Sequence, residues 1–143
     1  MSVLGEARAH LAKAEEFLAA AELSAEFDHM DAATSSAVIS GINAKDAICL
    51  ALTGSTGKSD DHRRAVTELR RAGPDTTTHA ANLGRLLRLK NRSQYQATTT
   101  SRSDASSAVG WARVPCEGAK EALVAAPKMD SRADGRSPAP ACP

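Results

Sequence analysis

Apolar residues recur with helical spacing in the first part of the chain. In the segment 3–27 they stand at positions 4, 7, 11, 14, 18 and 21, where leucine alternates with alanine. Steps of three and four residues place these side chains on one face of a helix. Because alanine is small, a second helix can approach this face closely. The pattern predicts an amphipathic first helix whose leucine–alanine face turns inward.

The next segments keep the helical period but differ in how much of their surface is apolar. Residues 31–53 are apolar around most of the circumference, which predicts the central helix of a bundle. Glycines, hydroxyl residues and adjacent acids then form a loop, and a short third helix over 61–73 ends at Gly73-Pro74. A fourth helix is expected over 75–91, with Leu83, Leu86 and Leu87 facing inward.

The last third of the chain predicts one more helix and a tail. Ser101 or Ser103 can cap a fifth helix, and we expect Pro115 to interrupt it before a shorter piece resumes. Residues 126–143 show no periodic apolar pattern, so a disordered tail is expected there. The sequence therefore predicts an all-α fold, an antiparallel bundle of four to five helices over residues 1–125.

Composition agrees with this fold and excludes several functions. Aromatic residues make up only 3% of the chain, which favours closely packed helices over a sheet sandwich. The formal net charge is +1, so any anion-binding surface has to be local. No apolar run is long enough for a membrane span, and the N-terminus lacks the features of a signal peptide. We therefore expect a cytoplasmic protein that does not bind membranes.

No metal or cofactor is expected. Cys49, Cys116 and Cys142 lack the spacing of metal ligands, and Cys49 lies in an apolar stretch typical of the core. Asp60, Asp61 and His62 stand together at the start of the expected third helix and could suggest a metal site, but further ligands at matched spacing are missing. Adjacent acids before a helix more often stabilise its first turn. His62 is kept as a single titratable group suited to proton transfer near neutral pH.

Two charged residues fall on inward-facing positions. Asp46 shares a helix face with Ile39, Ile42 and Leu50, and Lys90 lies beside the inward leucines of the fourth helix. A buried charge has to be paired or hydrogen-bonded. We expect Asp46 to pair with Lys90 in the first place, or with His62 in the second. The alternative is that one helix is rotated and its charge reaches solvent.

The outer side of the fourth helix carries a row of cations. Arg85, Arg88 and Arg92 follow one another at steps of three and four residues, and Tyr95 continues the row if the helix extends that far. Arginines in this spacing can follow a phosphate backbone, and a tyrosine ring can stack on a base. The same row is also typical of a solvated helix face, and the pattern alone leaves both interpretations open.

Several segments in order resemble the HEPN family (higher eukaryotes and prokaryotes nucleotide-binding), in particular small actinobacterial members. They are EARAHLAKAEEFLAAAEL, the alanine-rich SSAVISGINAKDAICLAL with its DAIC stretch, the His-initiated HRRAVTEL, and a fourth helix ending LGRLLRLKNRSQYQ, with K-x-x-x-x-Y. The resemblance covers about residues 5–113. It implies an antiparallel helical bundle, usually a homodimer.

The resemblance also implies a set of functions. Many HEPN proteins are metal-independent endoribonucleases, often toxins paired with a nucleotidyltransferase antitoxin, and others are RNA-binding or interaction modules. The catalytic signature is Arg-x(4–6)-His, and Arg92 matches its arginine. Ala97, Thr98 and Thr99 stand where its histidine is required. Whether the chain is an enzyme is therefore left open.

Two functions follow as hypotheses. In the first, the end of the fourth helix binds RNA or a nucleotide through Arg85, Arg88, Arg92 and Tyr95. If it also cleaves RNA, Arg92 would stabilise phosphate charge, and Tyr95 or His62 would transfer protons. In the second, the chain is a non-catalytic interaction protein, an antitoxin or an adaptor, with Arg92 and Tyr95 as anchors of a partner surface.

Overall fold

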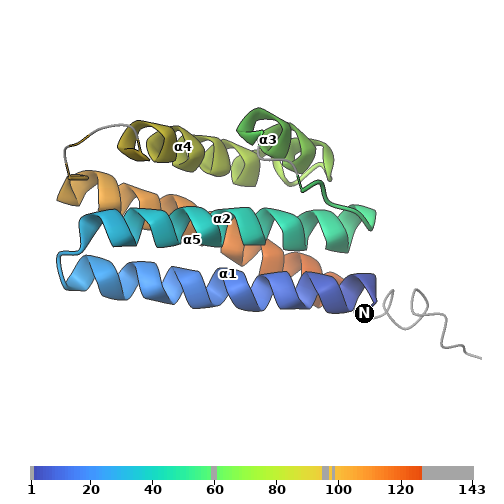
Figure 1. The fold of residues 1–143 in the computed structure, drawn as a ribbon. Coiled ribbons are helices and arrows are strands. Elements are labelled where there is room, and N and C mark those ends of the chain that lie inside the picture. The colour runs from blue at the N-terminus through green and yellow to red at the C-terminus, as the bar shows by residue number, and fades with distance from the viewer. Residues whose placement is uncertain (1, 59–60, 95–96, 98, 127–143) are drawn as a thin grey trace, which may run out of the picture.

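The computed structural model describes residues 2–58, 61–94, 97 and 99–126, and this part of the chain is a bundle of helices without a strand (Figure 1). The all-α prediction is confirmed. In chain order the helices are α1 (Val3–Glu26), α2 (Met30–Thr53), α3 (His62–Arg71), α4 (Thr77–Gln94) and α5 (Arg102–Ala125).

The long helices run back and forth, and α3 lies against one side of the bundle. Figure 1 shows α1 and α2 side by side and antiparallel, with α5 behind α2 and α4 above it. As predicted, α2 is central, because it contacts each of the other four helices. The short α3 lies near the end of α2 and packs mainly on α4. None of the described helices combines the length and the apolar run needed to cross a membrane.

Local sequence signals set the ends of the helices. The Ser2 hydroxyl caps α1 by accepting from the Gly5 amide, and the Ser101 hydroxyl does the same for α5 at Asp104. The Asp61 carboxylate caps α3 by accepting from the backbone amides of Arg63 and Arg64. Each bond satisfies a helical N–H group that has no carbonyl partner within its helix. Gly54 ends α2 in the left-handed conformation, which glycine adopts without steric cost.

The core consists of small and aliphatic side chains, as the periodicity predicted. Leu4, Ala7, Ala14 and Ala21 of α1 are buried, so the leucine–alanine face does turn inward. The leucines of α4 expected inside are also buried, and so is Cys49. Alanines at these positions allow α1 and α5 to pack closely against α2.

Two expectations about the helices are wrong. Pro115 does not interrupt the fifth helix, since α5 is continuous from Arg102 to Ala125. A proline there removes one helical hydrogen bond, but Pro115 is fully buried, and the packing of α5 offsets the loss. Ile39 does not face inward with Asp46, because its side chain is 39% exposed. The buried face of α2 is therefore rotated relative to the predicted one.

Two glycines of α5 should respond oppositely to substitution by alanine. A Cβ atom at Gly118 would overlap the imidazole of His79 on α4, whereas one at Gly110 would meet no atom within 4 Å. We expect Gly118→Ala to lower the free energy of unfolding by about 1–3 kcal/mol through overpacking. Gly110→Ala should raise it by about 0.5–1 kcal/mol through helix propensity. Urea denaturation of the two variants measures both, and equal effects would refute the close α4–α5 contact.

Candidate functional site

A cleft between α3 and α4 brings together residues from two of the predicted segments. It has a volume of about 560 Å³. From α3 it is lined by the first turns, including His62 and Arg63, and from α4 by Arg88 and Asn91. Val66, Thr67, Gly84 and Leu87 complete its described lining. The cleft forms because α3 and α4 pack together.

The chemistry of this α3/α4 cleft suits an anion. Arg63 and Arg88 are exposed at its edge, His62 is half-buried, and no carboxylate is among its described lining residues. Guanidinium groups bind phosphate through several N–H donors in a fixed geometry. The imidazole adds a group that can accept or donate a proton near neutral pH. The cleft thus combines cationic donors with one candidate for proton transfer.

Of the other predicted site residues, one lies away from this cleft and two have side chains outside the described part of the chain. Arg85 is exposed on α4 but does not line it. Arg92 belongs to α4, one turn beyond Arg88, so its backbone continues the same helix face, while its side chain lies outside the described part. Tyr95 also lies outside the described residues. Arg63 was not predicted as a site residue, although it stands next to His62 at the start of α3 and lines the cleft.

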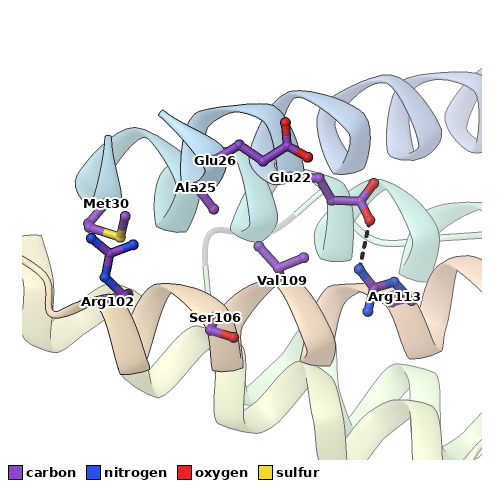
Figure 2. A pocket seen from close by; sticks show the side chains of 8 residues that line it. All are labelled: Glu22, Ala25, Glu26, Met30, Arg102, Ser106, Val109 and Arg113. Carbon is purple, nitrogen blue, oxygen red and sulfur yellow. Dashed lines mark hydrogen bonds and ion pairs between the residues drawn. The ribbon is translucent and has the colours of Figure 1, made fainter. Parts of the chain in front are cut away.

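A second cleft of about 420 Å³ lies between α5 and the junction of α1 with α2, and its charges neutralise one another (Figure 2). Arg113 donates to Glu22 over 2.6 Å, the interaction marked in Figure 2. Arg102, at the other end of this cleft, pairs with Asp28 over 2.7 Å. Since carboxylates already hold both arginines, this cleft is a poorer candidate for a polyanion than the α3/α4 cleft.

A buried lysine connects α3 to the centre of the bundle. Lys45 of α2 is only 3% exposed, and its ammonium group donates to the Thr56 hydroxyl over 2.8 Å and to the Gly57 carbonyl over 3.4 Å. It also forms ion pairs with Asp46, at 3.3 Å, and with Glu68 of α3. Burying an ammonium ion is costly unless carboxylates and hydrogen bonds compensate it, and here they do.

Glu68 completes the connection from the side of α3. Its two carboxylate oxygens accept from the Gly57 amide over 3.0 and 3.1 Å, in addition to the ion pair with Lys45. Leu69 is the only residue of α3 that is fully buried. The position of α3 therefore depends on the apolar contacts of Leu69 and Val66 and on the Lys45–Glu68 pair.

The ion pair links stability to pH in two directions. The hydrogen bond from Lys45 lowers the pKa of Glu68 below its ordinary 4.5, so the stability it adds is lost as the pH falls through the lowered value. For Lys45, burial acts to lower the pKa, but the hydrogen bond to Glu68 and the nearby negative charges raise it above its ordinary 10.5. Its contribution is lost as the pH rises through the raised value. The pair contributes its full stability between the ordinary pKa values of the two groups, 4.5 and 10.5, and loses it progressively outside that range.

The same polar cluster reaches α1. The Nδ1 atom of His10 lies 2.9 Å from the Asn43 side-chain oxygen and 3.9 Å from a carboxylate oxygen of Asp46. On the other side of the ring, Nε2 lies 3.2 Å from the ammonium nitrogen of Lys58. The cluster thus joins α1, α2, the loop after α2 and α3 through polar side chains.

The expected pairing of Asp46 with Lys90 or His62 is not found. Asp46 is buried, as predicted, but its described partners are Lys45, His10 and the Thr56 hydroxyl, which donates over 2.6 Å. Helical spacing predicted a partner on another helix, whereas the closest cation belongs to the adjacent residue, Lys45. Side chains of neighbouring helical residues point in different directions, and here the folded loop at Thr56 and Gly57 brings both groups to one place.

The two described cysteines are not candidates for nucleophilic chemistry. Burial raises the pKa of Cys49 to about 11, and burial also raises the pKa of Cys116. The thiolate is the reactive form of cysteine, so neither group is a nucleophile near neutral pH. Both side chains act as small core residues.

Replacing Lys45 should destabilise the fold far more than replacing an exposed lysine close by. Lys45→Met leaves Asp46 buried without its cation, and we expect the free energy of unfolding to fall by about 3 kcal/mol. Lys58→Met, in the loop after α2, should change it by less than about 0.5 kcal/mol. Chemical denaturation followed by circular dichroism gives both values, and a Lys45→Met variant as stable as the parent would disprove the role of the buried pair.

Comparisons with known proteins agree with the fold and identify the family. Neither a curated protein nor a solved structure matches the chain significantly. The family model of the HEPN domain matches residues 7–120, which covers most of the chain and includes the α3/α4 cleft and the buried Lys45. The chain therefore belongs to the HEPN-domain family.

Proposed function

We propose that this HEPN domain binds RNA in the α3/α4 cleft. The observation that carries the proposal is the charge of that cleft: Arg63 and Arg88 line it without a carboxylate among the described lining residues. The cleft of similar size between α1 and α5 has its arginines held by Glu22 and Asp28. Neutralising phosphates with uncompensated arginines is the main source of protein affinity for nucleic acid.

Each residue has a role in this proposal. Arg63 and Arg88 contact phosphate oxygens from opposite sides of the cleft. Arg92, one turn further along α4, and Arg85, on the outer face of α4, extend the cationic surface. Tyr95 stacks on a base, as aromatic side chains do in sites that bind single strands. We expect this binding to take place in the cytoplasm.

A more specific form of the proposal is that the domain also cleaves the RNA it binds. Cutting RNA without a metal requires a group that takes a proton from the attacking hydroxyl and a cation that offsets charge at the phosphorus. His62 supports this version, because it lines the same cleft as Arg88. It would replace the histidine that the family signature expects at positions 97–99, with Arg92 stabilising the phosphate and Tyr95 as the second group for proton transfer.

The alternative is a non-catalytic interaction module. The overall charge of +1 and the absence of a histidine at positions 97–99 favour it. A homodimer, or a complex with a nucleotidyltransferase of a toxin–antitoxin pair, would then use the α4 surface around Arg88 and Arg92. The two functions differ in what Arg88 touches, which is phosphate in one and a partner protein in the other.

Binding of fluorescein-labelled single-stranded RNA, measured by anisotropy, separates these functions. We expect salt-sensitive binding that Arg88→Ala weakens about fivefold, with the slope of log K against log salt reduced by about 0.7 for the lost phosphate contact. Arg102→Ala removes an arginine of the other cleft, where Asp28 pairs with it, and should leave the affinity unchanged. No binding, or equal effects of the two variants, would contradict the proposal and favour the interaction module.

The same RNA tests cleavage when it is incubated with the protein in EDTA. If the domain is a nuclease, His62→Ala abolishes cleavage while the affinity for RNA stays within about twofold, because proton transfer acts on the chemical step. Cleavage that survives in His62→Ala would exclude His62 as the proton-transfer group. Binding without cleavage in the parent protein would show an RNA-binding module.

A further inference from the structure

A third cleft lies on the side of α3 that faces the end of α2. It has a volume of about 280 Å³, and its charged lining residues are Arg64, Arg71 and Glu68. Arg64 and Arg71 stand two helical turns apart and therefore project from one face of α3. Arg63, one residue before Arg64, lines the α3/α4 cleft instead. The two clefts thus flank α3, and each receives arginines from it.

The one carboxylate among the described lining residues of this α2/α3 cleft offsets only part of the charge of its two arginines. Glu68 is already bound by the Lys45 ammonium group and by the Gly57 amide. The charge of Arg64 is the smallest of the influences that lower the pKa of Glu68. Lys45 is shared between Glu68 and Asp46, so it offsets only part of their negative charge. The two arginines and Lys45 still outnumber these two carboxylates, and the positive charge that remains is accessible to a ligand at the exposed Arg64 and Arg71.

Both arginines are accessible. Arg64 and Arg71 are exposed, and their guanidinium groups form no ion pair within the described part of the chain. The cleft also contains Thr53 and Ser55, at the end of α2 and in the loop that follows. Hydroxyl groups commonly add hydrogen bonds to phosphate oxygens beside arginine. The chemistry of this second cleft is therefore that of another phosphate site.

The positions of the two clefts define the size of the ligand. A helix with its side chains is about 10–12 Å across, so a ligand that reaches both clefts has to pass over α3. A nucleotide with one phosphate can occupy only one of them. Resting on the RNA binding proposed above, we propose that the substrate is a single-stranded RNA that crosses α3, with phosphates bound by Arg88 and Arg63 on one side and by Arg64 and Arg71 on the other.

A single strand fits this arrangement better than a duplex. The flexible backbone of a single strand can follow the outer surface of α3 from one cleft to the other. Duplex RNA is A-form, and its major groove is too deep and narrow for side chains to read. Duplex DNA, whose wider major groove admits a helix, is the competing ligand and is included in the test.

The test compares a short and a long ligand in the double variant Arg64→Ala/Arg71→Ala. The probes are a 5′-phosphorylated uridine dinucleotide and a uridine dodecanucleotide, with affinities measured by isothermal titration calorimetry at several salt concentrations. We expect the variant to bind the dodecanucleotide about tenfold more weakly, with a salt slope reduced by about 1.4 for two lost phosphate contacts. The affinity for the dinucleotide should fall by less than about twofold, because the α3/α4 cleft remains a complete binding site for this short ligand.

Two controls make the result specific. Arg102→Ala/Arg113→Ala removes two arginines from the cleft shown in Figure 2, so its total charge change is the same, and we expect both affinities to match those of the parent. All replaced arginines are exposed, and thermal melting should show that each double variant folds as the parent does.

The possible failures are distinguishable. If Arg88→Ala weakens both ligands but Arg64→Ala/Arg71→Ala weakens neither, or weakens both equally, RNA does not cross α3 and only the present inference falls. If the parent binds neither RNA, or Arg88→Ala has no effect on either, the proposed function falls as well. Duplex DNA that binds the parent more tightly than the dodecanucleotide, and loses that affinity in Arg64→Ala/Arg71→Ala, would overturn the single-stranded substrate.

Discussion

The buried ammonium group of Lys45 is the interaction on which the arrangement of the site depends. It joins Asp46 on its own helix to Thr56 and Gly57 in the loop and to Glu68 on α3. Because α3 has little apolar surface in the core, a polar connection of this kind largely determines where the helix lies. A buried charge with fixed partners tolerates fewer alternative arrangements than apolar contacts, since each displaced partner leaves a charge uncompensated.

The position of α3 in turn produces the electrostatic character of the surface. With α3 held beside α4, His62 and Arg63 meet Arg88 across a cleft with no described carboxylate. The same Lys45 binds the Glu68 carboxylate on the other side of α3, where Arg64 and Arg71 are exposed. A single buried cation therefore holds α3 in place and also offsets part of the negative charge beside the exposed arginines. A chain of nearly neutral net charge can thereby present a local surface suited to a polyanion.

Most of the fold could be predicted from the sequence, because periodicity and caps are local. The inward face of α1, the leucines of α4 and the caps at Asp61 and Ser101 all follow from residues close together in the chain. The effect of Pro115 on α5 could not be predicted from the residues next to it, because the packing that offsets its missing hydrogen bond comes from other helices. The buried Asp46 was predictable, but its partners were not, because a loop and a third helix bring them together. For the same reason, His62 and Arg88 were recognised separately, whereas their common cleft depends on the packing of α3 against α4.

Backbone amide chemical shifts recorded during titration with single-stranded RNA test the central claim most directly, because they report on α3, α4 and the rest of the bundle in one experiment. The expected result is a set of perturbed amides in α3 and in the second half of α4 around Arg88, with the amides near Arg102 and Arg113 unchanged. Perturbations centred on the cleft between α1 and α5, or no perturbation at saturating RNA, would contradict the assignment of the α3/α4 cleft as the RNA site.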